Sequence, residues 1–98
     1  MLIDAVNINH SPETSTATLI KGIKARDIKT LNQLYDLYAP ALFGYILRTV
    51  VHEKVANEVL QNTFLKIWSS IDAYDENQGR LLTWMLNIAL KESMKLDH

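Results

Sequence analysis

The most strongly patterned stretch of this chain reads Ala56-Asn57-Glu58-Val59-Leu60-Gln61-Asn62-Thr63-Phe64-Leu65-Lys66-Ile67-Trp68. Apolar and small side chains recur in it at intervals of three and four residues, and in an α-helix such residues share one face. The spacing therefore predicts a helix over about residues 54–70 whose shared face is buried in a core. The residues on that face are Ala56, Leu60, Thr63, Phe64, Ile67 and, just beyond the stretch, Ile71.

The opposite face of the same predicted helix carries Glu58, Gln61, Asn62 and Leu65, again at helical spacing. Three side chains that form hydrogen bonds surround an outward-facing leucine, and such a face can bind another protein. The alternative is an ordinary surface helix, because isolated exposed leucines are common and the outer face of most surface helices is polar. The pattern alone leaves both interpretations open.

Length and composition limit the classes of protein to consider. The 98 residues suffice for one domain with a modest core, and 48% apolar against 21% charged residues predicts that it folds. A formal net charge of −1 means that any nucleic-acid site must be a local patch. The chain has no cysteine for disulfides and no apolar run long enough to cross a bilayer. We therefore expect a soluble protein of the cytoplasm.

Residues 1–16 mix Asn, Ser, Thr and Pro with little periodicity and are predicted to form a flexible N-terminal arm. Residues 17–98 are expected to make up the folded domain. The expected fold class is all-α, a compact bundle of about four helices, since no stretch has a convincing strand pattern.

Two helices are predicted before the central stretch, over about residues 17–25 and 28–51. Gly22 weakens the first, whereas Asp27 can cap the start of the second. Pro40 removes one backbone donor, so we expect a kink or break in the turn before it. The predicted core residues are Leu19, Ile20 and Ile23 in the first helix, and Leu31, Leu34, Tyr35, Tyr38, Leu42, Tyr45, Ile46 and Thr49 in the second.

Residues 69–79 form the clearest loop, because Asp, Asn, Glu and Gly cluster there. A last helix is predicted over residues 80–96, with Leu81, Leu82, Met85, Ile88, Ala89 and Leu96 on its core side. Its opposite side carries Arg80, Trp84, Asn87, Lys91, Lys95 and His98.

Cations, an amide and an aromatic ring along one side of this last helix are the residue types that hold phosphates and stack on bases. The alternative is that Trp84 lies at the margin of the core and that the lysines are ordinary solvated charges. The three histidines, His10, His52 and His98, are too far apart to indicate a metal site. We therefore predict no metal, no cofactor and no catalytic site.

The order of these elements closely resembles region 2 of the extracytoplasmic-function (ECF) sigma factors, the promoter-specificity subunits of bacterial RNA polymerase. The resemblance extends over roughly residues 19–96. The segments that carry it are Leu34-Tyr35-Asp36-Leu37-Tyr38-Ala39-Pro40-Ala41-Leu42, the stretch 56–68, Tyr74-Asp75, Trp84-Met85 and Ile88-Ala89.

The resemblance implies a transcription initiation module without enzymatic activity. Its partners would be core RNA polymerase, whose largest-subunit clamp helices the central helix would bind, the promoter −10 element, and a candidate anti-sigma factor. By position, the polymerase surface would comprise Glu58, Gln61, Asn62 and Leu65. The loop 72–79 and the residues Arg80, Trp84, Asn87, Lys91 and Lys95 would bind and open the −10 element.

The chain also departs from the family pattern. Family members usually have Ala-Glu-Asp at Ala56-Asn57-Glu58 and Glu at Asn62, so the docking surface is less acidic here. They commonly have Arg-Asn at Leu90-Lys91, and an Asp and an Arg where this chain has Lys95 and His98. The family's second, helix-turn-helix domain is missing, so we expect a fragment or a reduced homologue.

Two alternatives remain. The chain can be a protein-interaction domain, derived from a sigma factor, that has lost promoter opening; Leu90-Lys91 favours this. It can also be an unrelated helical bundle with an enzymatic or ligand-binding role, which the lack of clustered titratable groups disfavours.

Overall fold

The computed structural model describes residues 15–96, and no strand occurs in this part of the chain. Its elements are α2 (Thr16–Lys24), α3 (Ile28–Thr49), α4 (Glu53–Ser70), the 3-10 helix η3 (Ile71–Ala73) and α5 (Leu81–Leu96). The predicted all-α fold with about four helices is thereby confirmed. The predicted arm lies outside the described residues except for Ser15 and Thr16, and so does His98.

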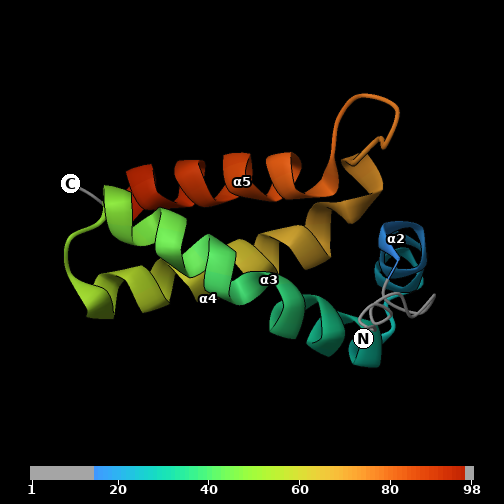
Figure 1. Ribbon diagram of the computed structural model, residues 1–98, viewed down its shortest axis with the longest axis horizontal. Coiled ribbons are helices and arrows are strands. Elements are labelled where there is room, and N and C mark those ends of the chain that lie inside the picture. The colour runs from blue at the N-terminus through green and yellow to red at the C-terminus, as the bar shows by residue number, and fades with distance from the viewer. Residues whose placement is uncertain (1–14, 97–98) are drawn as a thin grey trace, which may run out of the picture.

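The three long helices α3, α4 and α5 pack against one another, and consecutive helices run in opposite directions (Figure 1). α2 packs on α3 and η3, at the end of the bundle where the loop between η3 and α5 projects (Figure 1). The projecting loop and α2 therefore lie at the same end of the molecule.

In residues 15–96 no helix is long and apolar enough to cross a membrane.

α2 is capped by Ser15, whose hydroxyl accepts a hydrogen bond from the backbone N–H of Thr18 (3.2 Å). Its three predicted core residues are all buried. Gly22, which weakened the prediction of this helix, allows α2 to approach α3 closely. A Cβ at this position would lie 2.3 Å from Oγ1 of Thr30, so any side chain would force the two helices apart.

α3 has the predicted cap. The carboxylate of Asp27 accepts hydrogen bonds from the backbone N–H of Lys29 (3.1 Å) and the hydroxyl of Thr30 (2.9 Å). The bond from Lys29 satisfies a backbone donor that has no partner inside the first turn of the helix. Of the predicted apolar stripe, Leu34, Leu42 and Ile46 are fully buried, and the other five residues are half-buried at the margin of the core.

The structure differs from the predictions for α3 at two points, while a kink at Pro40 stays a prediction. The helix continues through Pro40 without the expected break. Proline removes a single backbone donor, and buried Ala39 and Leu42 on either side hold both halves of the helix to the core. The helix also ends earlier than predicted, at Thr49, and the side chain of Val51 is 86% exposed.

α4 has the helical phase that its sequence predicts. Every residue of the predicted core face is buried, and so is Val59, which the prediction omitted. The ring of Phe64 packs against that of Tyr35, with 4.7 Å between the ring centroids. Leu65, the next residue along, is 67% exposed, so adjacent positions of α4 face opposite environments.

The core side of α5 differs from the prediction at both ends. Leu82 is 37% exposed rather than buried, since a helix that buries Leu81 and Met85 turns Leu82 toward the margin. Glu92 and Ser93 are buried although neither is apolar. The hydroxyl of Ser93 is satisfied by donating to the carbonyl of residue 89 (2.8 Å). The side chain of residue 96, also predicted to be core, is not among those described.

Candidate functional site

The outer face of α4, defined as Glu58, Gln61, Asn62 and Leu65, is the first candidate surface. Glu58, Gln61 and Leu65 are exposed and Asn62 is half-buried, so the structure brings all four to the solvent side of α4. The amide of Gln61 donates a hydrogen bond to the hydroxyl of Tyr35 on α3 (3.3 Å). α3 therefore helps to orient a side chain of this face.

A shallow groove of about 350 Å³ lies beside this face, between α3 and α4. It is lined by Tyr35, Asp36, Ala39, Pro40, Phe43, Asn57 and Leu60. Most of these residues belong to α3, and the sequence pattern gave no sign that they adjoin the outer face of α4. The groove enlarges the candidate surface with apolar and aromatic side chains.

The loop between η3 and α5 is closed by its own hydrogen bonds. The hydroxyl of Tyr74, a residue that is 6% exposed, donates to the carbonyl of Gly79 (2.7 Å), which joins the two ends of the loop. The side chain of Asp75 accepts from the backbone N–H of Asn77 (2.9 Å) and so supports the turn. The loop therefore presents a defined surface next to the start of α5.

Burial raises the pKa of the Tyr74 phenol, and the nearby carboxylates of Glu76 and Asp75, followed by Tyr38, raise it further. Burial and negative neighbours both disfavour the charged phenolate. The hydroxyl therefore stays protonated at neutral pH and remains a donor to the carbonyl of Gly79.

We expect Tyr74→Phe to weaken the pH dependence of stability in alkaline solution. Because the folded pKa is raised, the stabilisation by the neutral phenol is complete below about pH 10, the usual tyrosine pKa, and is lost as pH rises through the folded pKa. Urea titrations from pH 7 to pH 11 should show a steeper loss of stability in the parent chain than in Tyr74→Phe. Tyr45→Phe is the matched control, and equal curves for the parent chain and Tyr74→Phe would contradict the prediction.

A pocket of about 160 Å³ opens between this loop and the first turns of α5. It is lined by Ala73, Tyr74, Asp75, Gln78, Gly79, Arg80, Thr83, Trp84 and Asn87. Trp84 is half-buried, and its ring packs on that of Tyr74 with 5.2 Å between centroids. Trp84 therefore lies at the margin of the core and also forms a wall of the pocket.

A second groove, between α4 and α5, adjoins the pocket because Ala73 and Trp84 line both. Its other lining residues are Lys66, Ser70, Ile88, Lys91, Glu92 and Lys95. We call the pocket and this groove together the α5 surface. All five residues that the sequence suggested for nucleic-acid contact, namely Arg80, Trp84, Asn87, Lys91 and Lys95, line the α5 surface.

The charges of the α5 surface differ from those predicted in two ways. The ammonium group of Lys95 lies 3.0 Å from the carboxylate of the buried Glu92, which offsets part of its positive charge. Lys66 joins Lys91 along the groove although it belongs to α4. Sequence reasoning missed Lys66 because only the packing of α4 on α5 brings it there.

The α5 surface combines an aromatic wall, an amide and one cation, Arg80, at the pocket with three lysines along the groove, and the carboxylates of Asp75 and Glu92 lie among them. A base that is not stacked in a duplex exposes its edges and faces to such a pocket, and cations beside it can hold the phosphates. No group of three or more His, Cys, Asp or Glu side chains within residues 15–96 is arranged to hold a metal ion. The surface therefore holds residue types that can contact single-stranded nucleic acid.

Comparison with known families matches residues 34–95 to the model of sigma-70 region 2. The chain is similar to the "ECF RNA polymerase sigma factor SigK" of Mycobacterium sp. (strain KMS), with 25% identity over 81 residues, 83% of this chain and 42% of that protein. It is also similar to proteins of the same name from Mycolicibacterium vanbaalenii (25% over 76 residues, 78% of this chain and 39% of the relative) and Mycobacterium tuberculosis (strain ATCC 25177 / H37Ra; 21% over 76 residues, 78% and 41%).

The chain spans less than half the length of these curated relatives. No solved structure matches it significantly.

Proposed function

Because the chain belongs to the sigma-70 region 2 family, we propose that it acts in transcription initiation by binding core RNA polymerase through α4 and promoter DNA through the α5 surface. The observation that carries the proposal is that the matched residues, 34–95, contain both candidate surfaces. We infer that it has no enzymatic activity of its own.

The outer face of α4, with the groove beside it, would bind the clamp helices of the largest polymerase subunit. Leu65 supplies an exposed apolar centre, and Glu58, Gln61 and Asn62 supply hydrogen-bonding groups around it. An apolar centre with a polar rim is the usual composition of a protein interface.

Polymerase works in the bacterial cytoplasm, so we propose that location for this chain. An anti-sigma factor is a further proposed partner, which rests on the family resemblance.

The α5 surface would hold the −10 element after its strands separate. The pocket at the loop between η3 and α5 would take an unstacked base against Trp84, and Arg80, Lys66 and Lys91 would hold phosphates. Lys91 stands where the family usually has an amide, which both donates and accepts hydrogen bonds, whereas lysine only donates. Attraction to the strand is therefore retained with less ability to distinguish bases.

We expect this chain to bind single-stranded −10-like DNA weakly and with little preference over a scrambled strand. Three phosphate contacts at about 0.7 each give an expected salt slope of about two on a log–log plot. Fluorescence anisotropy with both oligonucleotides over a salt series measures the slope and the preference. Lys91→Glu should weaken binding to both strands, whereas Lys29→Glu, at the start of α3 and outside the α5 surface, should have a much smaller effect.

A strong preference for one strand that persists at high salt would contradict this expectation. Such a result would mean that the loop between η3 and α5 reads a base without the usual family residues.

A second candidate function is a protein-interaction domain, derived from a sigma factor, that has lost promoter opening. The pairing of Lys95 with Glu92 favours it, because that pairing removes part of the positive charge from the α5 surface. A complete lack of DNA binding at low salt, together with retained polymerase binding, would support this candidate over the first.

A further inference from the structure

Arg26, in the turn between α2 and α3, has a backbone conformation that is uncommon for its residue type. Its φ is +58°, and among residues 15–96 it is the only non-glycine residue with a positive φ. In this left-handed region the Cβ of an L-residue lies close to the carbonyl oxygen that follows, so few residue types other than glycine adopt it. Such a conformation persists where other contacts hold the residue in place.

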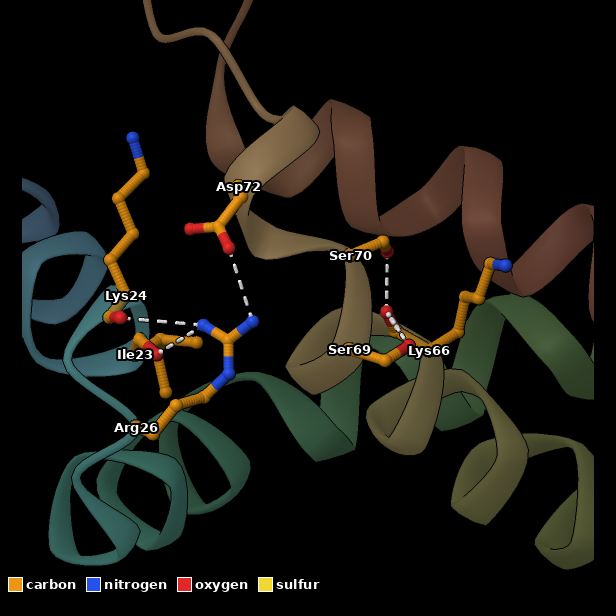
Figure 2. Close-up of polar contacts among 7 residues, drawn as sticks. All are labelled: Ile23, Lys24, Arg26, Lys66, Ser69, Ser70 and Asp72. Atoms are coloured by element: carbon orange, nitrogen blue, oxygen red, sulfur yellow. Dashed lines mark hydrogen bonds and ion pairs between the residues drawn. The ribbon is translucent and has the colours of Figure 1, made fainter.

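Backbone hydrogen bonds at the end of α2 hold this conformation, since the N–H groups of Arg26 and Asp27 donate to the carbonyl oxygens of Ile23 (2.9 Å) and Gly22 (3.0 Å). The side chain of Arg26 adds further contacts, as Figure 2 shows. Its guanidinium donates to the carbonyl oxygens of Ile23 (3.1 Å) and Lys24 (3.4 Å) at the end of α2, and to the carboxylate of Asp72 in η3 (3.3 Å). It also lies over the ring of Trp68 in α4, 5.8 Å from the ring centroid. One side chain thereby joins α2, α4 and η3.

The 3-10 helix η3, which Arg26 contacts through Asp72, lies directly beside the α5 surface. Ala73, the neighbour of Asp72, lines both the pocket and the groove, and Tyr74 lines the pocket. On the other side of η3, the hydroxyls of Ser69 and Ser70 donate to the carbonyl of Lys66 and so hold the last turn of α4 (Figure 2). η3 is therefore held at its start by α4 and from the side by Arg26.

We propose that Arg26 is a positioning residue that sets η3, and with it the base pocket, for contact with DNA. The proposal rests on the proposed function of the α5 surface. The ion pair alone is a weak restraint, because the side chains of Arg26 and Asp72 are 37% and 72% exposed. The planar guanidinium adds two carbonyl contacts and the cation–π contact with Trp68, and a lysine cannot make all of these at once.

The first experiment measures the position of η3 without DNA, by amide hydrogen exchange in the full chain. Arg26→Ala, Arg26→Lys and Arg26→Gly should each speed exchange in residues 72–80 by about five- to tenfold, since local opening becomes easier when its restraints are lost. Exchange in the middle of α4 and α5 should not change. Lys24→Ala is the matched control, because only the backbone carbonyl of Lys24 bonds to Arg26 and no dashed line in Figure 2 joins its side chain to Asp72.

Arg26→Gly separates positioning from general stability. Glycine adopts a positive φ without strain, so the melting temperature of this variant should be retained while exchange in residues 72–80 rises. Unchanged exchange in residues 72–80 in all three variants would overturn the proposal, whether or not the chain binds DNA.

The second experiment compares binding to single-stranded −10-like DNA by fluorescence anisotropy at low salt. Arg26→Lys keeps the charge but should weaken binding about as much as Arg26→Ala does, whereas Lys24→Ala removes a charge and should have little effect. Equal affinity of all variants, despite faster exchange, would overturn the role of Arg26 in DNA contact. Failure of the parent chain to bind any strand would count against the proposed function, and the exchange result would still decide whether Arg26 holds η3.

Discussion

Phe64→Ala is expected to lower the free energy of unfolding by about 3–5 kcal/mol, the usual cost of removing a buried phenylalanine ring and leaving a cavity. The ring is buried against Tyr35 of α3, so its removal leaves a gap between α3 and α4. Leu65→Ala, one position further along, should cost less than about 0.5 kcal/mol because Leu65 is mostly exposed. Urea titrations of the two variants provide the comparison.

A loss of this size is a large part of the stability of a domain of this length, so Phe64→Ala can prove too unstable to titrate. Ile67→Val removes one methylene group from the same buried face and should cost about 0.5–1.5 kcal/mol. A loss for Leu65→Ala as large as that for Ile67→Val would mean that the helical phase of α4 is not the one described, because alanine does not lower helix propensity at an exposed position.

The double variant Gln61→Glu with Leu65→Lys is expected to abolish binding to the polymerase clamp helices. It places two charges at the centre of the proposed interface, where loss of a central contact commonly weakens binding by about thirtyfold or more. The two new side chains are four residues apart in the order that favours a helical ion pair, so the helix itself should not be destabilised. A pull-down with purified clamp helices, followed by titration, measures the loss.

Val51→Lys is the control for this experiment. It also replaces an exposed apolar residue with lysine, but at the end of α3, outside the outer face of α4 and the groove beside it. The control should bind as the parent chain does, and both variants should keep the parent melting temperature. Retained binding by the double variant would place the polymerase contact on another surface.

The sequence was most informative where one helix had one buried face. In α4 the three- and four-residue spacing predicted both the burial of Phe64 and the exposure of Leu65, because a helix of known period has a single free parameter, its rotation about its axis. Capping by Asp27 was also predictable, since a cap depends on residues only two or three positions away. Local chemistry is sufficient for features of this kind.

Features that depend on the packing of distant segments were not predictable in this way. Lys66 reaches the α5 surface because α4 packs on α5, and Asp36 and Phe43 adjoin the outer face of α4 because α3 does. Arg26 and Asp72 meet across forty-six positions of sequence. The uninterrupted helix at Pro40 has the same origin, since burial of the neighbouring residues outweighs the loss of one backbone hydrogen bond.

α4 passes into η3 without an intervening loop, since α4 ends at Ser70 and η3 begins at Ile71. At 1.5 Å per residue, the 18 residues of α4 form a helix about 27 Å long. In the proposed function, polymerase binds along α4 and the DNA strand binds near the C-terminal end of α4. The length of α4 therefore sets the distance between the two binding sites. One inserted residue would lengthen α4 by only about 1.5 Å but would turn its two ends relative to each other by about 100°. The position and orientation of the bound DNA strand relative to polymerase would then depend on the length and rotation of a single helix.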